Sequence, residues 1–195
     1  DLSADSPSLP VYLSIGIKHL LLGFDHVLFV LMLLYLVRTP IAIVKVVTSF
    51  TVAHSITLAL SAFDVVSLSS APVEAAIAGS IVLLAYENLR TQKSVSHNFP
   101  VIIAFSFGLL HGLGFAGALA EIGLPESSQI MALLLFNVGI ELGQLAIITV
   151  VLLLLAAVRI RFSRLAYEAP IYLTGGVASF WFMQRAWLIL VPAFS

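Results

Sequence analysis

Long apolar segments separated by short polar connections dominate the chain. A bilayer core is about 30 Å thick, and a helix needs roughly 20 apolar residues to cross it. Segments of about this length predict six membrane-crossing helices, over residues 12–37, 41–63, 73–89, 99–120, 130–158 and 170–190. Because the connections are short, we expect an all-α membrane protein, a compact polytopic bundle with a single transmembrane domain over residues 11–195.

Positive residues near the ends of the predicted helices indicate the orientation, because such charges tend to stay on the cytoplasmic side. Most of the nine Lys and Arg residues lie at the first, third and fifth connections: Arg38, Lys45, Arg90, Lys93, Arg159, Arg161 and Arg164. Lys18 and Arg185 fall inside predicted helices and are expected to be membrane-surface anchors. Both termini are therefore predicted outside, including a polar segment over residues 1–10 that starts without methionine and suggests a removed signal peptide.

Composition narrows the chemistry further. Only 10% of the 195 residues are charged, against roughly 25% in a soluble domain, so a water-soluble globule is excluded. The net charge of −1 provides no basic surface for nucleic acid. The chain has no cysteine, which excludes disulfides and thiolate metal sites. Any metal site must use nitrogen and oxygen ligands.

Several ionisable side chains lie within the predicted helices, where a charge costs at least about 2.5–3.5 kcal/mol. At about 1.5 Å per residue, four of them reach the middle of the bilayer: Asp25, His26, His54 and His111. Their shared depth predicts one central metal site. His19 precedes His26 by two helical turns, or roughly 10 Å, so one ion is not expected to use both. The spacing places His19 at an outer station or behind the ligands of the central site.

Other polar residues are predicted to lie along a path or behind the ligands. Asn137, Glu141 and Gln144 form one stripe on the fifth predicted helix, which indicates either a path or helix packing. Glu87 is either an exit station or a partner for Arg90. Ser55, next to His54, is expected either to satisfy the backbone or to orient the imidazole, since a metal-bound histidine usually donates its second nitrogen.

The two halves of the chain show faint similarity. HLLLGF from His19 resembles HGLGF from His111, and FTVAHS from Phe50 resembles FNVGIE from Phe136. Three predicted helices per half would make these repeats inverted in the membrane, as in many transporters. We therefore expect a weak inverted 3+3 repeat.

The motif His19-x5-Asp25-His26, with TVAHSITL, YEN, HGLGFAG and NVGIELGQ, resembles the HupE/UreJ family of hydrogenase and urease accessory membrane proteins. This resemblance implies a nickel permease or an accessory to nickel enzymes in the bacterial inner membrane, with nickel-enzyme maturation proteins as partners. It also implies that His19, Asp25 and His26 belong to the metal site, completed by His54, His111 and Glu141.

These observations favour transport of a divalent metal over enzymatic activity. Imidazole and carboxylate ligands suit Ni, Co or Zn, and the resemblance implies Ni. An outward entrance would admit the ion to the central site, with His19, Glu87 and Glu141 as relay positions. The alternative is an intramembrane zinc hydrolase, because three histidines leave an open position for water and Asp25 or Glu141 would act as base. Haem ligation by paired histidines is a third interpretation.

Overall fold

The computed structural model describes residues 9–37, 39–90, 95–122, 128–158 and 163–191, without the side chains of residues 9, 116–122 and 158. Helices account for the regular structure in these ranges: α1 (Leu9–Leu22), α2 (Phe24–Leu36), α3 (Pro40–Ala62), α4 (Ser70–Leu89), α5 (Val95–Asn98), α6 (Pro100–Ile122), α7 (Gln129–Val158) and α8 (Arg164–Leu190). The expected all-α class is confirmed. The expectations for residues 1–8 and for Arg38, Lys93, Arg159 and Arg161 lie outside the described residues.

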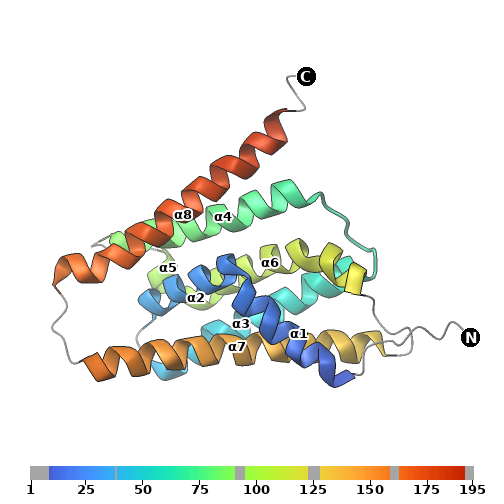
Figure 1. The fold of residues 1–195 in the computed structure, drawn as a ribbon, viewed down its shortest axis with the longest axis horizontal. Coiled ribbons are helices and arrows are strands. Elements are labelled where there is room, and N and C mark those ends of the chain that lie inside the picture. Colours follow the sequence, from blue (N-terminus) through green and yellow to red (C-terminus); the bar gives the residue numbers. More distant parts are fainter. Residues whose placement is uncertain (1–8, 38, 91–94, 123–127, 159–162, 192–195) are drawn as a thin grey trace, which may run out of the picture.

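The long helices run back and forth along the longest axis of the molecule (Figure 1). The end of α2, the start of α3, α5, the end of α7 and the start of α8 lie at one end of the bundle, on the left of the view. Lys45, Arg90 and Arg164 belong to helix ends on this side. Local capping defines two of these starts, since the side chains of Thr39 and Ser163 accept hydrogen bonds from backbone amides of α3 and α8.

Three helices are long and apolar enough to cross a membrane: α3, α4 and the segment Gln129–Ala157 of α7. The bent pair α1 and α2 would add a fourth. The apolar described part of α6, Pro100–Phe115, is shorter, and α8 falls outside this group because polar and small residues such as Thr174, Gly175 and Gln184 interrupt it. Length and composition of the described helices thus support three or four crossings, fewer than the six that the sequence predicts.

The first predicted helix is broken at Gly23, and this corrects the expectation of one continuous span over residues 12–37. α1 and α2 meet at an angle of 75°. The Gly23 amide still donates to the His19 carbonyl at 2.9 Å, and its own carbonyl accepts from the Val27 amide at 3.1 Å. The backbone is therefore well bonded through the bend.

Two helix crossings depend on close backbone contact. A Cβ atom at Gly16 in α1 would collide with the Phe136 carbonyl of α7, and one at Gly108 in α6 would collide with the Phe50 carbonyl of α3. Helices approach this closely in membranes where the interface carries small residues. The pairs α1/α7 and α3/α6 are accordingly tightly packed.

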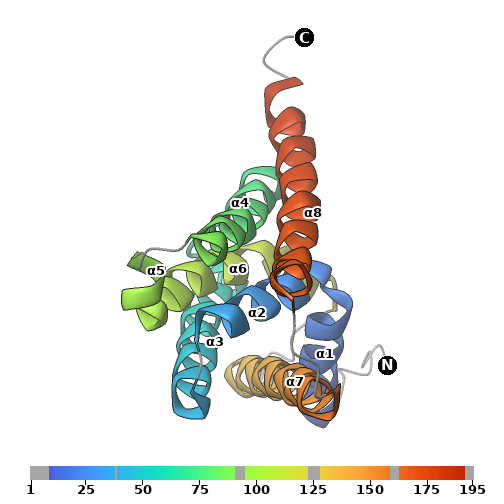
Figure 2. The same cartoon turned by 90° about the vertical axis from the view of Figure 1, so that its left-hand side faces the viewer.

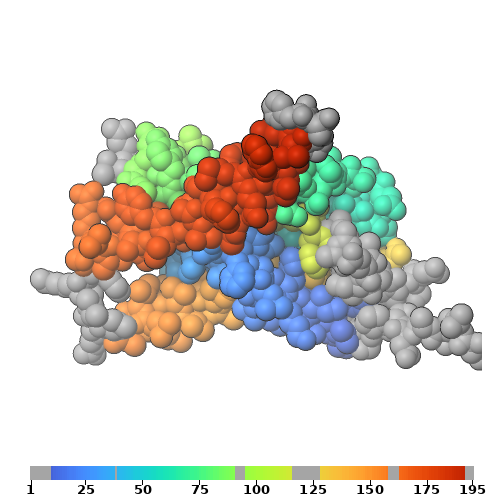
Figure 3. Space-filling view, turned by 45° about the horizontal axis from the view of Figure 1, so that its top comes forward, coloured from blue at the N-terminus to red at the C-terminus, as the bar shows by residue number. Residues whose placement is uncertain are grey.

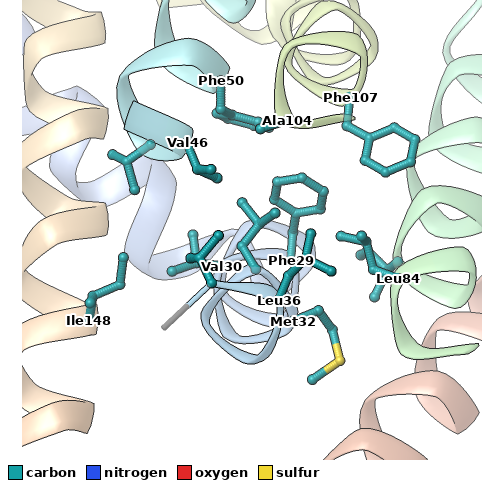
Figure 4. Packing of buried hydrophobic residues seen from close by; sticks show 14 of the residues in the cluster. Phe29, Val30, Met32, Leu36, Val46, Phe50, Leu84, Ala104, Phe107 and Ile148 are labelled. Atoms are coloured by element: carbon teal, nitrogen blue, oxygen red, sulfur yellow. The ribbon is translucent and has the colours of Figure 1, made fainter. Parts of the chain in front are cut away.

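The main apolar core surrounds α2 (Figure 4). Phe29, Val30 and Met32 of α2 are almost fully buried, and α3, α4, α6 and α7 provide the surrounding side chains. α2 thus forms the centre of the bundle, and its first turn extends directly into the candidate site.

α8 lies at the edge of the molecule (Figures 2 and 3). It packs mainly on α4, through the buried residues Ile171, Thr174 and Ala178. Most of its other large apolar side chains are exposed, among them Leu173 and Met183. An exposed apolar surface of this extent suits a lipid environment rather than water.

Candidate metal centre

The bend at Gly23 brings two histidines together. His19 occupies the last turn of α1 and His26 the first turn of α2, and their ring centroids are 4.7 Å apart. The separation of roughly 10 Å expected for a straight helix is therefore wrong, because the break folds the second turn back toward the first. His19 shares the central position with His26.

Gly23 has no room for a side chain. A Cβ atom there would lie 2.9 Å from the His19 carbonyl oxygen, 2.9 Å from Nδ1 of His26 and 3.1 Å from Oδ1 of Asp25. Contacts below 3.0 Å with backbone require the chain to move. Glycine at this position is thus what allows the two imidazoles to approach.

His54 of α3 is the third member of the cluster. Its ring centroid is 6.1 Å from that of His26 and 6.4 Å from that of His19, and the residue is fully buried. One ring nitrogen from each of the three histidines lies within 4.8 Å of the other two. Nitrogens on one tetrahedral zinc stand about 3.3 Å apart, so small side-chain rotations would close the cluster around an ion.

The Nε2 atoms of these three histidines are buried and have no hydrogen-bond partner among the described residues. A buried polar atom without a partner is costly, and in native structures it often marks a functional site. Three imidazoles whose ring nitrogens approach this closely, each with its Nε2 unpartnered within the described ranges, are what a metal site built from imidazole requires.

His111 of α6 adjoins this cluster without belonging to the group of three. Its ring centroid is 4.9 Å from that of His26, and it contacts the rings of Phe29 and Phe50. It is 1% exposed, and neither ring nitrogen has a partner within the described part of the chain. The structure thus brings all four sequence-predicted histidines to one region.

Asp25 contacts the cluster through Nδ1 of His26. Its Oδ1 accepts from the His26 backbone amide at 2.9 Å and lies 3.1 Å from Nδ1 of the same residue. A carboxylate in the first turn of α2 also interacts favourably with the helix dipole. Asp25 therefore orients the imidazole and supplies negative charge next to the three nitrogens.

Of the two roles expected for Ser55, the structure shows the contact with the backbone, and another residue orients His54. The Ser55 hydroxyl donates to the Thr51 carbonyl of its own helix at 2.7 Å. Nδ1 of His54 instead lies 3.0 Å from Oδ1 of Asn137, on α7. The sequence contains Asn137 as an intramembrane polar residue, but only the packing of α3 on α7 identifies its partner.

The remaining predicted polar residues lie away from the three nitrogens. Glu141 accepts from the Thr48 hydroxyl at 2.6 Å, and Gln144 accepts from the Thr51 hydroxyl at 3.3 Å. These pairs continue the polar contacts between α3 and α7. Glu87 lies near the end of α4, where one oxygen is 3.9 Å from the Arg90 guanidinium.

A cavity of about 220 Å³ borders the cluster. Its lining includes His19, Asp25, His26 and His111. It also includes the ion pair of Glu74 with Arg185, which was not predicted from the sequence. In that pair Arg185 of α8 lies 2.7 Å from Glu74 of α4. Arg185 is therefore more than the surface anchor that the sequence predicts. The available signal was Glu74 itself, a carboxylate within the third predicted helix.

A second cavity of about 350 Å³ lies against the bend between α1 and α2. Lys18, Leu22 and Gly23 line it, and His19 and Phe115 border both cavities. The rings of His19 and Phe115 are packed with centroids 3.7 Å apart. These two side chains thus lie between the two cavities.

Comparison with known proteins agrees with this geometry. A family model described as HupE / UreJ protein matches residues 3–185, nearly the whole chain. No curated protein and no solved structure matches. The matched region contains every residue of the histidine cluster, and we conclude that the chain belongs to the HupE/UreJ family.

Proposed function

We propose that this protein binds a divalent first-row transition metal at His19, His26 and His54 and moves it across the membrane. The observation that carries the proposal is the meeting of three imidazoles from α1, α2 and α3, each with a buried Nε2 atom, beside a cavity. Membership of the HupE/UreJ family supports metal handling. Delivery of the metal to nickel-enzyme maturation proteins is compatible with the same site.

The ligand set supports Ni, Co or Zn as the substrate. Neutral imidazole is a borderline ligand that suits these ions, whereas Mg and Mn prefer sites rich in oxygen. Asp25 would offset part of the charge of a dication, since it contacts His26 directly. The family favours Ni among the three.

The path would run from the second cavity, beside Lys18 and Gly23, to His19 and the rest of the cluster. It would continue between α3 and α7. His111 would receive the ion beside His26, and Glu141 and Gln144 would provide oxygen atoms beyond His54. Glu87 would serve as a station near the C-terminal end of α4, next to Arg90. In this arrangement the end with Lys45 and Arg90 faces the cytoplasm of a bacterial cell, and both termini face outward.

Paired contacts within the bundle support an inverted repeat, and hence transport. Adding 92 to a residue number in α1 gives the equivalent residue of α6, as for His19 and His111, and Gly16 then corresponds to Gly108. Adding 86 to a residue number in α3 gives the equivalent residue of α7. Phe50, which contacts Gly108, therefore corresponds to Phe136, which contacts Gly16. The same two shifts relate the α1/α7 contact of Leu20 with Gly143 to the α6/α3 contact of Gly112 with Thr57.

Inverted repeats of this kind allow one half of a transporter to move against the other around a central site. A hydrolase has no need of such an exchange. The repeat therefore favours transport over the alternative, an intramembrane zinc hydrolase that would use the same histidines.

Metal titration of the purified protein tests the proposal. We expect the wild type to bind Ni²⁺, Co²⁺ or Zn²⁺, and His26→Gln or His54→Gln to lower the affinity at least 100-fold, because each removes one of three ligands. His97→Gln on α5 is the matched control, since this histidine lies outside the cluster. A wild-type protein that binds none of these ions would contradict the proposal.

Uptake into vesicles separates transport from hydrolysis. Protein in sealed vesicles is expected to accumulate the bound metal over time, and the two cluster variants are expected to abolish the accumulation. Tight metal binding with no accumulation would overturn the transport proposal and favour the hydrolase.

A further inference from the structure

Asn137 has both parts of its amide engaged. The residue is 4% exposed, its Nδ2 donates to the Leu133 carbonyl at 2.8 Å, and its Oδ1 lies 3.0 Å from Nδ1 of His54. Exchanging the amide oxygen and nitrogen would place two acceptor oxygens, those of Asn137 and Leu133, against each other. The Leu133 carbonyl therefore determines that Oδ1 faces the imidazole.

This orientation determines the tautomer of His54. An amide oxygen only accepts hydrogen bonds, so Nδ1 of the ring must carry the proton. In a neutral imidazole the other nitrogen, Nε2, then holds the lone pair. Nε2 of His54 is buried and has no partner among the residues that the structure describes. It is the nitrogen left free for a ligand.

The neighbouring hydroxyls do not replace Asn137. Thr51 donates to the Val47 carbonyl and the Gln144 amide oxygen, Ser55 to the Thr51 carbonyl, and Thr57 to the Ala53 carbonyl. Thr57 also donates to the backbone carbonyl of His54 at 3.4 Å, and each of these bonds goes to an acceptor other than the His54 imidazole. The described contacts thus leave Asn137 alone to select between the two tautomers of this ring.

We propose that Asn137 is a positioning residue that holds His54 in its Nδ1-protonated form, with Nε2 available to a metal ion. Asp25 has the corresponding relation to His26, because its Oδ1 lies 3.1 Å from Nδ1 of that ring. Both imidazoles would then use Nε2 as the ligand atom. The consequence for metal affinity rests on the proposed function, whereas the tautomer does not.

Nitrogen NMR of metal-free protein in lipid tests the tautomer directly. With ¹⁵N-labelled histidine, the protonated and unprotonated ring nitrogens of His54 have well-separated shifts, and His54→Gln assigns them. We expect Nδ1 protonated and Nε2 unprotonated in the wild type. A proton on Nε2 of wild-type His54 would overturn the proposal, even if no Asn137 variant folded.

Three variants separate positioning from helix packing. Asn137→Leu keeps the size but removes the acceptor, so both tautomers should appear, whereas Asn137→Asp should restore the wild-type pattern. Gln144→Met is the matched control, because it removes a polar contact in the same α3/α7 interface without touching an imidazole. An unchanged His54 spectrum in folded Asn137→Leu would contradict the proposal.

Titration with Ni²⁺ and Zn²⁺ tests the consequence for binding. Loss of a partner behind a ligand typically weakens metal binding by 10–100-fold, which is the loss expected for Asn137→Leu. A wild type with the expected tautomer that binds neither ion would disprove the proposed function alone. A wild type that binds metal with the opposite tautomer would disprove the role of Asn137 alone.

Discussion

Gly23 is the residue on which the geometry of the cluster depends most directly. It separates α1 from α2, and its α-carbon faces the His19 carbonyl, the His26 ring and the Asp25 carboxylate. A methyl group in this position must displace the backbone at His19 or the side chain of His26 or Asp25. The position therefore links a local steric constraint to the chemistry of the site.

Gly23→Ala is expected to reduce metal affinity at least 10-fold and to destabilise the fold by about 1–3 kcal/mol, as an overpacked site does. Metal titration and thermal unfolding measure the two effects. Gly176→Ala is the matched control, because a Cβ atom there would meet nothing within 4 Å. An affinity equal to that of the wild type would show that Gly23 does not limit the approach of the histidines.

The histidines of the candidate site were more predictable from the sequence than the partners that orient them. The cost of burying His26, His54 and His111 in lipid singles them out without any structure. The acceptor that orients His26 is its chain neighbour Asp25, whereas the acceptor that orients His54 depends on helix packing. There Asn137 takes the place expected for Ser55. Contacts between distant segments cannot be deduced from spacing along one helix.

At the scale of the helices, the pairs α1/α7 and α3/α6 share one type of crossing. In each, a glycine abuts the carbonyl of a buried phenylalanine on the partner helix. A backbone carbonyl in the middle of a helix cannot move aside as the end of a flexible side chain can. Larger residues at either glycine should therefore separate the helices.

Gly16→Ala and Gly108→Ala are each expected to destabilise the protein by more than 1 kcal/mol and by similar amounts, because they occupy equivalent crossings. Thermal unfolding in lipid or detergent provides the measurement. Gly79→Ala is a suitable comparison, since its Cβ atom would meet Phe182 at an ordinary distance of 3.4 Å. A large loss for one crossing with none for the other would weigh against the repeat.

Most helix positions follow from the apolar segments, but the break does not. The polar residues near Gly23, namely His19, Asp25 and His26, are isolated positions in an otherwise apolar segment, and glycine is common inside membrane helices. The bend becomes favourable only when α2 enters the core through Phe29 and its neighbours. The separation of His19 and His26 was mispredicted for this reason.

For the whole molecule, the arrangement in Figure 1 defines two ends that should face opposite sides of a membrane. Val65 follows α3 at one end, and Val95 begins α5 at the other. Both are 67% exposed. Since the chain has no cysteine, a single introduced cysteine reports its own position without interference.

Val65→Cys is expected to react with a membrane-impermeant maleimide from outside intact cells, and Val95→Cys only after permeabilisation. The positive charges near Val95, which favour the cytoplasmic side, are the physical reason. Reaction of both cysteines from the same side would contradict the predicted topology. Reaction from the two sides in reverse order would contradict only the orientation.

The most direct test of the metal site is a high-resolution structure of the metal-loaded protein, with elemental analysis and an anomalous map at the absorption edge of the bound metal. The account predicts one strong peak among His19, His26 and His54, roughly 2 Å from a ring nitrogen of each. A loaded protein with its only peak elsewhere, or with these three rings still apart, would contradict it.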